Sequence, residues 1–115
     1  MRGLRLDKPW LALTAAAVAA LPGQLGVYEL GDADGAVLRI GYAGGRTAFG
    51  LRSALGAELA ARGADSTATS FRVEVNQQYT TRWRELLMVH VADHGHLPPE
   101  QPDPGVRLGR LSPGS

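Results

Sequence analysis

The stretch that decides the fold is LGVYELGDADGAVLRIGY, residues 25–42. Two short, mostly apolar runs, Leu25 to Leu30 and Ala36 to Tyr42, flank the segment Gly31-Asp32-Ala33-Asp34-Gly35. β-Branched and aromatic residues suit a pleated, half-buried surface, and Asp and Gly tolerate the backbone conformations of tight turns. The stretch therefore predicts a β-hairpin. Because an isolated hairpin is marginal in water, the rest of the chain must cover one of its faces.

Composition indicates one ordinary globular domain. The chain has 115 residues, 44% of them hydrophobic and 20% charged, and a net charge of +1, which excludes a strongly basic nucleic-acid coat. Seven arginines and three acidic residues lie between Ala36 and Arg84, so a face that binds a polyanion and a scattered solvated surface both stay open. The absence of cysteine excludes disulfides, thiolate catalysis and cysteine-ligated zinc. It is compatible with the cytoplasm, where we expect the protein.

The N-terminal segment 1–22 has two interpretations. The apolar run from Trp10 to Leu21 predicts a helix packed on the domain, with Asp7 as its cap, Pro9 near its first turn and a stop at Pro22-Gly23. The basic residues before this run also allow a secretory signal. The run is too short to span a bilayer, so we expect no membrane partner.

Two further helices and one strand are predicted after the hairpin. The first helix covers about 48–62, with Thr47 as its cap, Gly63 as its stop and leucines at four-residue spacing. The alternation in Phe71 to Val75 predicts a strand with one wet face. The second helix covers about 79–94, and Gly95 follows it. The fold class is therefore α+β, a small three-stranded antiparallel sheet flanked by helices. We divide the chain into the N-terminal helix 1–22, a core 23–97 and a Pro/Gly-rich, weakly packed tail 98–115.

The spacing of Gly26-Val27-Tyr28 and Arg39-Ile40-Gly41 resembles the GIY-YIG nuclease superfamily. The resemblance implies phosphodiester hydrolysis of nucleic acid with one Mg²⁺ or Mn²⁺ ion. It gives Tyr28, Arg52 and Glu85 as candidate catalytic residues, with Glu85 as the metal ligand. It also implies that these three side chains converge on one cleft.

Two departures from the family pattern favour a second interpretation. Arg39 stands where the family has a tyrosine, and Gln101 is the nearest amide to the place of a family asparagine. The alternative is a catalytically inactive domain of the same fold that binds nucleic acid or protein through a surface of Arg39, Arg46 and Arg52. The candidate substrate-binding residues are Arg39, Tyr42 and Arg46. The glycine-rich segment 41–47 lacks the Gly-Lys-Ser/Thr ending of a nucleotide-binding P-loop. Two interpretations stay open: a flexible connection between a strand and a helix, or a loop whose backbone approaches a phosphate.

Other candidate sites have weaker patterns. Glu85 is also compatible with a surface residue favoured near a helix start. His90 and His94 have the spacing of two zinc ligands, but the His-Glu-x-x-His pattern is absent, and a histidine cluster at a helix end is the alternative. No Ser/His/Asp or paired-carboxylate arrangement supports an unrelated hydrolase.

Overall fold

The fold is α+β, as predicted, with one strand more than expected. The computed structural model describes residues 5–63 and 65–102. Over these residues the antiparallel sheet has four strands in the order β1-β4-β2-β3. The strands are β1 Leu11–Ala12, β2 Gly26–Gly31, β3 Val37–Ala43 and β4 Ser70–Val75, and the helices are α1 Ala15–Ala19, α2 Gly50–Ala61 and α3 Tyr79–His94.

The predicted hairpin is confirmed as β2 and β3. The register pairs Tyr28 with Gly41. In the turn, Asp32 Oδ1 accepts the backbone N–H of Asp34 at 2.9 Å and that of Ala36 at 3.0 Å. Gly35 has φ 83°, a conformation that glycine adopts without steric cost. The local sequence therefore determines this unit.

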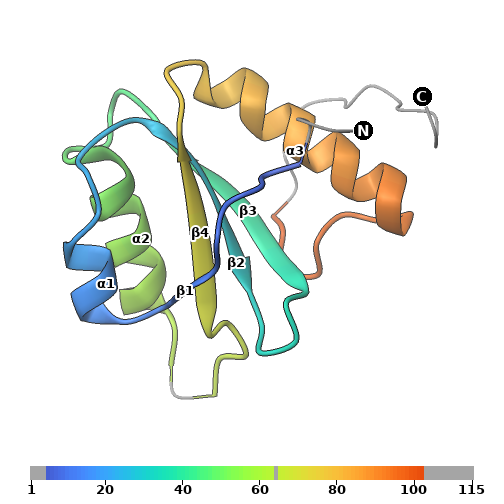
Figure 1. Ribbon diagram of the computed structural model, residues 1–115, viewed down its shortest axis with the longest axis horizontal. Coiled ribbons are helices and arrows are strands. Elements are labelled where there is room, and N and C mark those ends of the chain that lie inside the picture. Colours follow the sequence, from blue (N-terminus) through green and yellow to red (C-terminus); the bar gives the residue numbers. More distant parts are fainter. Residues whose placement is uncertain (1–4, 64, 103–115) are drawn as a thin grey trace.

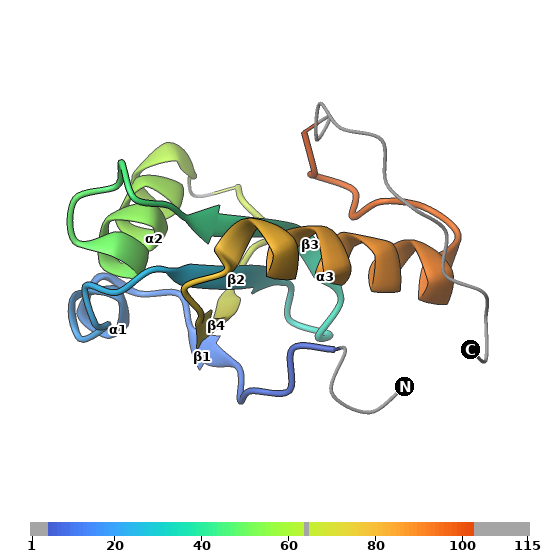
Figure 2. The same ribbon diagram turned by 90° about the horizontal axis from the view of Figure 1, so that it is seen from above.

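The strand β2 is central, because β4 pairs with its other edge. Successive strand residues point to opposite faces, so the two faces of the sheet have separate cores. Tyr28 and Leu30 pack with α1 and α2, whereas Val27 and Ile40 pack with α3. Figures 1 and 2 show α1 and α2 on one side of the sheet and α3 on the other.

The predicted N-terminal helix is wrong over most of its length. Leu11 and Ala12 extend and pair with Phe71 and Ser70 at the edge of β4. Only Ala15–Ala19 is helical, and Thr14, not Asp7, caps it by accepting the N–H of Ala17 at 3.2 Å. The open edge of β4 explains the difference, because an extended segment there satisfies backbone groups that a helix would leave unpaired.

The two long helices agree with the prediction except at one cap. The residue before α2 is Phe49, with φ 61° and no side-chain cap bond, so the predicted cap at Thr47 is wrong. The helix α3 spans the predicted residues and ends at Gly95 with φ 80°. In the described part of the chain, no helix is long and apolar enough to cross a membrane.

The charged side of β4 is covered rather than wet. Arg72 Nε donates to Glu29 at 2.7 Å, and Glu74 accepts a bond from Arg82 Nε at 2.8 Å. The Glu74 pair joins β4 to α3, whereas the Arg72 guanidinium lies 4.2 Å from the ring centroid of Trp10 in the N-terminal segment. Arg82 and Glu29 are buried. Alternating charge along this strand therefore indicated ion pairs covered by α3 and the N-terminal segment, not a solvated face.

Candidate functional site

Tyr28, from Gly26-Val27-Tyr28, lies over Gly41, from Arg39-Ile40-Gly41. A Cβ added at Gly41 would come within 2.2 Å of Tyr28 Cζ. The glycine therefore gives the Tyr28 ring a path across β3 on the face that α2 covers. This contact is a structural reason for the Gly-Val-Tyr and Arg-Ile-Gly spacing that applies whatever the domain does.

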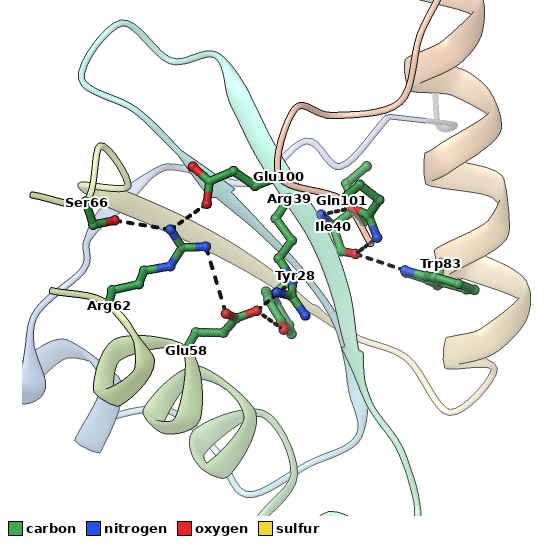
Figure 3. Close-up of polar contacts among 9 residues, drawn as sticks. All are labelled: Tyr28, Arg39, Ile40, Glu58, Arg62, Ser66, Trp83, Glu100 and Gln101. Atoms are coloured by element: carbon green, nitrogen blue, oxygen red, sulfur yellow. Dashed lines mark hydrogen bonds and ion pairs between the residues drawn. The ribbon is translucent and has the colours of Figure 1, made fainter. Parts of the chain in front are cut away.

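Glu58 on α2 is the acceptor at the end of the Tyr28 ring. The Tyr28 hydroxyl donates to Glu58 Oε2 at 2.6 Å. Arg39 Nε lies 3.0 Å from the same oxygen, although it is not aligned for a hydrogen bond. Arg62, one turn along α2, places a nitrogen 3.9 Å from Glu58 Oε1. Figure 3 shows the carboxylate between the two guanidinium groups, with the phenol beside it.

The C-terminal segment continues this network along the open edge of β3. Arg62 Nη1 donates to Glu100 Oε1 at 2.8 Å. The carboxamide of Gln101 pairs with Ile40 in both directions, accepting its N–H at 2.7 Å and donating to its carbonyl oxygen at 2.9 Å. Trp83 Nε1 donates to the same carbonyl at 2.9 Å (Figure 3). The segment 98–102 is thus held to β3 through Gln101 and the backbone N–H of Glu100, which donates to the Leu38 carbonyl oxygen at 2.9 Å. This differs from the predicted weak packing, whereas 103–115 lie outside the described residues.

The environment of Tyr28 keeps its hydroxyl protonated. Burial raises the pKa of Tyr28 above the usual value of about 10, and the hydrogen bond to Glu58 raises it further. Arg39 and Arg62 oppose this rise, but more weakly. The group is therefore a neutral hydrogen-bond donor at pH 7, not a phenolate ready to take a proton from water.

A small hollow opens where this network reaches the edge of β3. We call it the β3-edge hollow. It has a volume of about 240 Å³, and its walls include Tyr28, Arg39, Tyr42, Trp83 and Gln101. Tyr42 is 42% exposed. Its ring centroid lies 5.5 Å from that of Tyr79, with stacked planes, and 5.3 Å from that of Trp83, edge to face.

The structure does not bring the three candidate catalytic residues together. Tyr28 faces α2, and Glu85 belongs to α3 on the opposite face of the sheet, where it pairs with Arg82. Arg52 Nε donates to the carbonyl oxygen of Leu21 at 2.9 Å and so joins α2 to the end of α1. The expected convergence is wrong because α2 and α3 cover different faces, which their order along the chain does not reveal.

The candidate binding residues lie closer to one another. Arg39 and Tyr42 line the same hollow. Arg46 is exposed in the loop between β3 and α2. The adjoining Gly45 N–H donates to the Tyr79 hydroxyl oxygen at 3.2 Å, which holds the loop against the aromatic cluster.

The histidines form a ring cluster at the end of α3. The centroids of His90 and His94 are 4.4 Å apart, and His96 lies 5.9 Å from His90. No three His, Cys, Asp or Glu side chains in residues 5–63 and 65–102 are arranged to hold a metal ion. Burial lowers the pKa of His90 to about 4.

Sequence reasoning did not single out Glu58. Leu51 and Leu55 define the buried stripe of α2, and residue 58 continues it at helical spacing, so the buried acid lies on the apolar face. An acid at such a position needs a polar partner across the interface. That signal indicates that a polar partner exists, and the structure identifies Tyr28 and Arg39 as the residues beside Glu58.

Comparison with known proteins adds a family but no activity. Residues 4–93 match the model of a family described as "Domain of unknown function (DUF7508)". No curated protein and no solved structure matches the chain.

Proposed function

The chain belongs to that family, and on this premise we propose that the domain binds single-stranded nucleic acid at the β3-edge hollow without cleaving it. The observation that carries the proposal is the meeting at one hollow of the guanidinium group of Arg39, the exposed Tyr42 and the half-buried Trp83. Proteins that bind single strands combine these elements, since every base has a face that can stack on a ring and every phosphate attracts a cation.

The position of Arg39 suits this role. Its side chain is 35% exposed even though its Nε lies beside Glu58, and it lines the hollow. Arg46 adds a second cation on the loop next to the aromatic cluster, and it is exposed. Tyr42 is the exposed aromatic residue of the hollow. In this proposal a base stacks on Tyr42, and the adjoining phosphates are held by Arg39 and Arg46.

Metal-dependent hydrolysis, which the GIY-YIG resemblance implies, has less support. It requires Tyr28 to act on a water and Glu85 to hold Mg²⁺ or Mn²⁺ at the same phosphate. Glu85 lies across the sheet from Tyr28 and is paired with Arg82. The Tyr28 hydroxyl is already bonded to Glu58 at 2.6 Å. Arg39 in place of the family tyrosine is instead compatible with binding.

The test is fluorescence anisotropy with a labelled oligothymidine and a matched duplex. We expect the single strand to bind more tightly, with an affinity that falls as salt rises. Tyr42→Ala should weaken binding at least about fivefold, since stacking on one ring is worth about 1–3 kcal/mol, whereas Tyr42→Phe keeps the ring and should bind like the wild type. Equal affinity in these two variants would refute the role of the ring.

Charge is tested with a matched pair of variants. Arg46→Ala should reduce the slope of log affinity against log salt by about 0.7, as expected for one lost phosphate contact on a single strand. Lys8→Ala removes the same charge beside Glu74, on the other side of the central strand, and should leave the slope unchanged. Incubation of the protein and the oligothymidine with Mg²⁺ or Mn²⁺ tests the competing hypothesis of hydrolysis. Cleavage that is lost in Glu85→Gln would support hydrolysis and contradict the binding-only proposal.

A further inference from the structure

A second and larger cavity lies on the face of the sheet that α3 covers. We call it the α3 cavity. It has a volume of about 430 Å³ and lies between the hairpin turn, the N-terminal segment and the last two turns of α3. Its apolar walls include Leu6, Val37, Leu86 and Val89. A volume of this size falls in the range of small-molecule sites.

A buried carboxylate opens into this cavity. Glu29 is 5% exposed, and its Oε1 accepts the bond from Arg72 Nε at 2.7 Å. Its Oε2 accepts no hydrogen bond from residues 5–63 and 65–102, and Glu29 is one of the residues that line the cavity. A carboxylate oxygen in such a place attracts a donor, and a charged donor most strongly.

The charges around the cavity leave one carboxylate without a basic partner. Arg5 is paired with Asp93 at 2.6 Å, and Arg72 is paired with Glu29. Asp32, at the rim, accepts two backbone N–H groups through Oδ1 and has no ion pair among residues 5–63 and 65–102. The neighbouring imidazole of His90 adds no positive charge at pH 7, because burial lowers its pKa to about 4.

We propose that the α3 cavity binds a small alkyl ammonium ligand, with its cationic head between Glu29 and Asp32 and its alkyl chain against the apolar wall of α3. The excess of carboxylate favours a cation over an anion or a neutral polar molecule. The apolar wall favours a carbon chain. An organic cation fits better than a metal ion, since no three metal-ligating side chains in the described part of the chain converge.

Calorimetric titration with 1,4-diaminobutane and n-butylamine tests the ligand class. Both amines should bind, whereas 1-butanol and butyrate, which keep the chain and change the head, should not. The amine should change the NMR chemical shifts of the backbone amides of Gly35, Ala36 and Val89, which line the cavity. Equal binding of butyrate, binding of Mg²⁺ or Zn²⁺ in place of the amines, or no binding at millimolar concentration would each overturn the proposal.

Two neighbouring aspartates supply the matched variants. Asp32→Asn keeps the Oδ1 acceptor of the turn and removes the charge at the rim, so it should weaken amine binding about tenfold. Asp34→Asn makes the same change in the same turn, but Asp34 does not line the cavity and its variant should bind like the wild type. Equal affinity in both variants would refute the position of the head group. Glu29→Gln, checked for folding by circular dichroism, should also weaken binding.

The experiment is independent of the β3-edge hollow. Asp32→Asn should bind the oligothymidine as the wild type does, because the hollow lies at the outer edge of β3 and the α3 cavity does not include Tyr42 or Trp83. Loss of amine binding and loss of nucleic-acid binding are therefore separate results.

Discussion

Removal of the Tyr28 hydroxyl should destabilise the fold, and the structure sets the magnitude. The hydroxyl is buried and donates to Glu58 at 2.6 Å. A hydrogen bond to a charged group contributes about 1.5–3 kcal/mol. Glu58 keeps Arg39 at 3.0 Å and Arg62 at 3.9 Å after the change. We therefore expect Tyr28→Phe to lose about 1.5–2 kcal/mol of unfolding free energy, near the lower end of that range.

The assay is urea denaturation followed by circular dichroism at 25 °C, with an unchanged denaturant slope as the sign that both states stay comparable. The expected loss corresponds to a fall in melting temperature of about 6–8 °C for a chain of this length. Tyr42→Phe is the control, because Tyr42 is 42% exposed and its hydroxyl has no hydrogen bond within the described residues. It should lose less than about 0.5 kcal/mol. Equal stability of the two variants would refute the reasoning.

The same contact predicts an alkaline pH dependence. The pKa of Tyr28 is raised in the folded state, so above about pH 10 the unfolded chain releases this proton before the folded chain does. The stabilisation is complete below pH 10 and is lost as the pH rises further. Tyr28→Phe should therefore show a flatter fall in unfolding free energy between about pH 9.5 and 11 than the wild type. An identical fall in both proteins would contradict the raised pKa.

Four other substitutions test separate parts of the structure. Gly41→Ala should cost about 1–3 kcal/mol in urea denaturation, since its Cβ would lie 2.2 Å from the held Tyr28 ring, whereas Gly56→Ala on α2, with open space around it, should stabilise by up to about 1 kcal/mol. Glu85→Gln should cost less than about 1 kcal/mol by the same measurement, because its ion pair with Arg82 is partly exposed on the Glu85 side. The lowered pKa of His90 means that the unfolded state takes up this proton first, so stability should fall as the pH drops from about 6.5 toward 4, and the fall should shrink in His90→Phe.

Local patterns predicted most of the elements. The β2–β3 hairpin, α3 and β4 agree with the sequence within about one residue. Each of these elements contains its own signal: turn residues between apolar runs, a glycine after the last helical turn, or strict alternation. The N-terminal segment had a helical composition but became partly extended, because its backbone pairs with the exposed edge of β4. A neighbour far away in the sequence outweighed local propensity there.

The sequence alone determined which side chains share a face within each element, because the periods of strands and helices are fixed by backbone geometry. It placed Tyr28 and Leu30 together on β2, and Leu51 and Leu55 together on α2. Only the tertiary structure decided which helix covers which face of the sheet. That choice joined Tyr28 to Glu58 and put Glu85 on the far side, because the packing of a helix on a sheet depends on long-range burial and leaves no periodic trace in the chain.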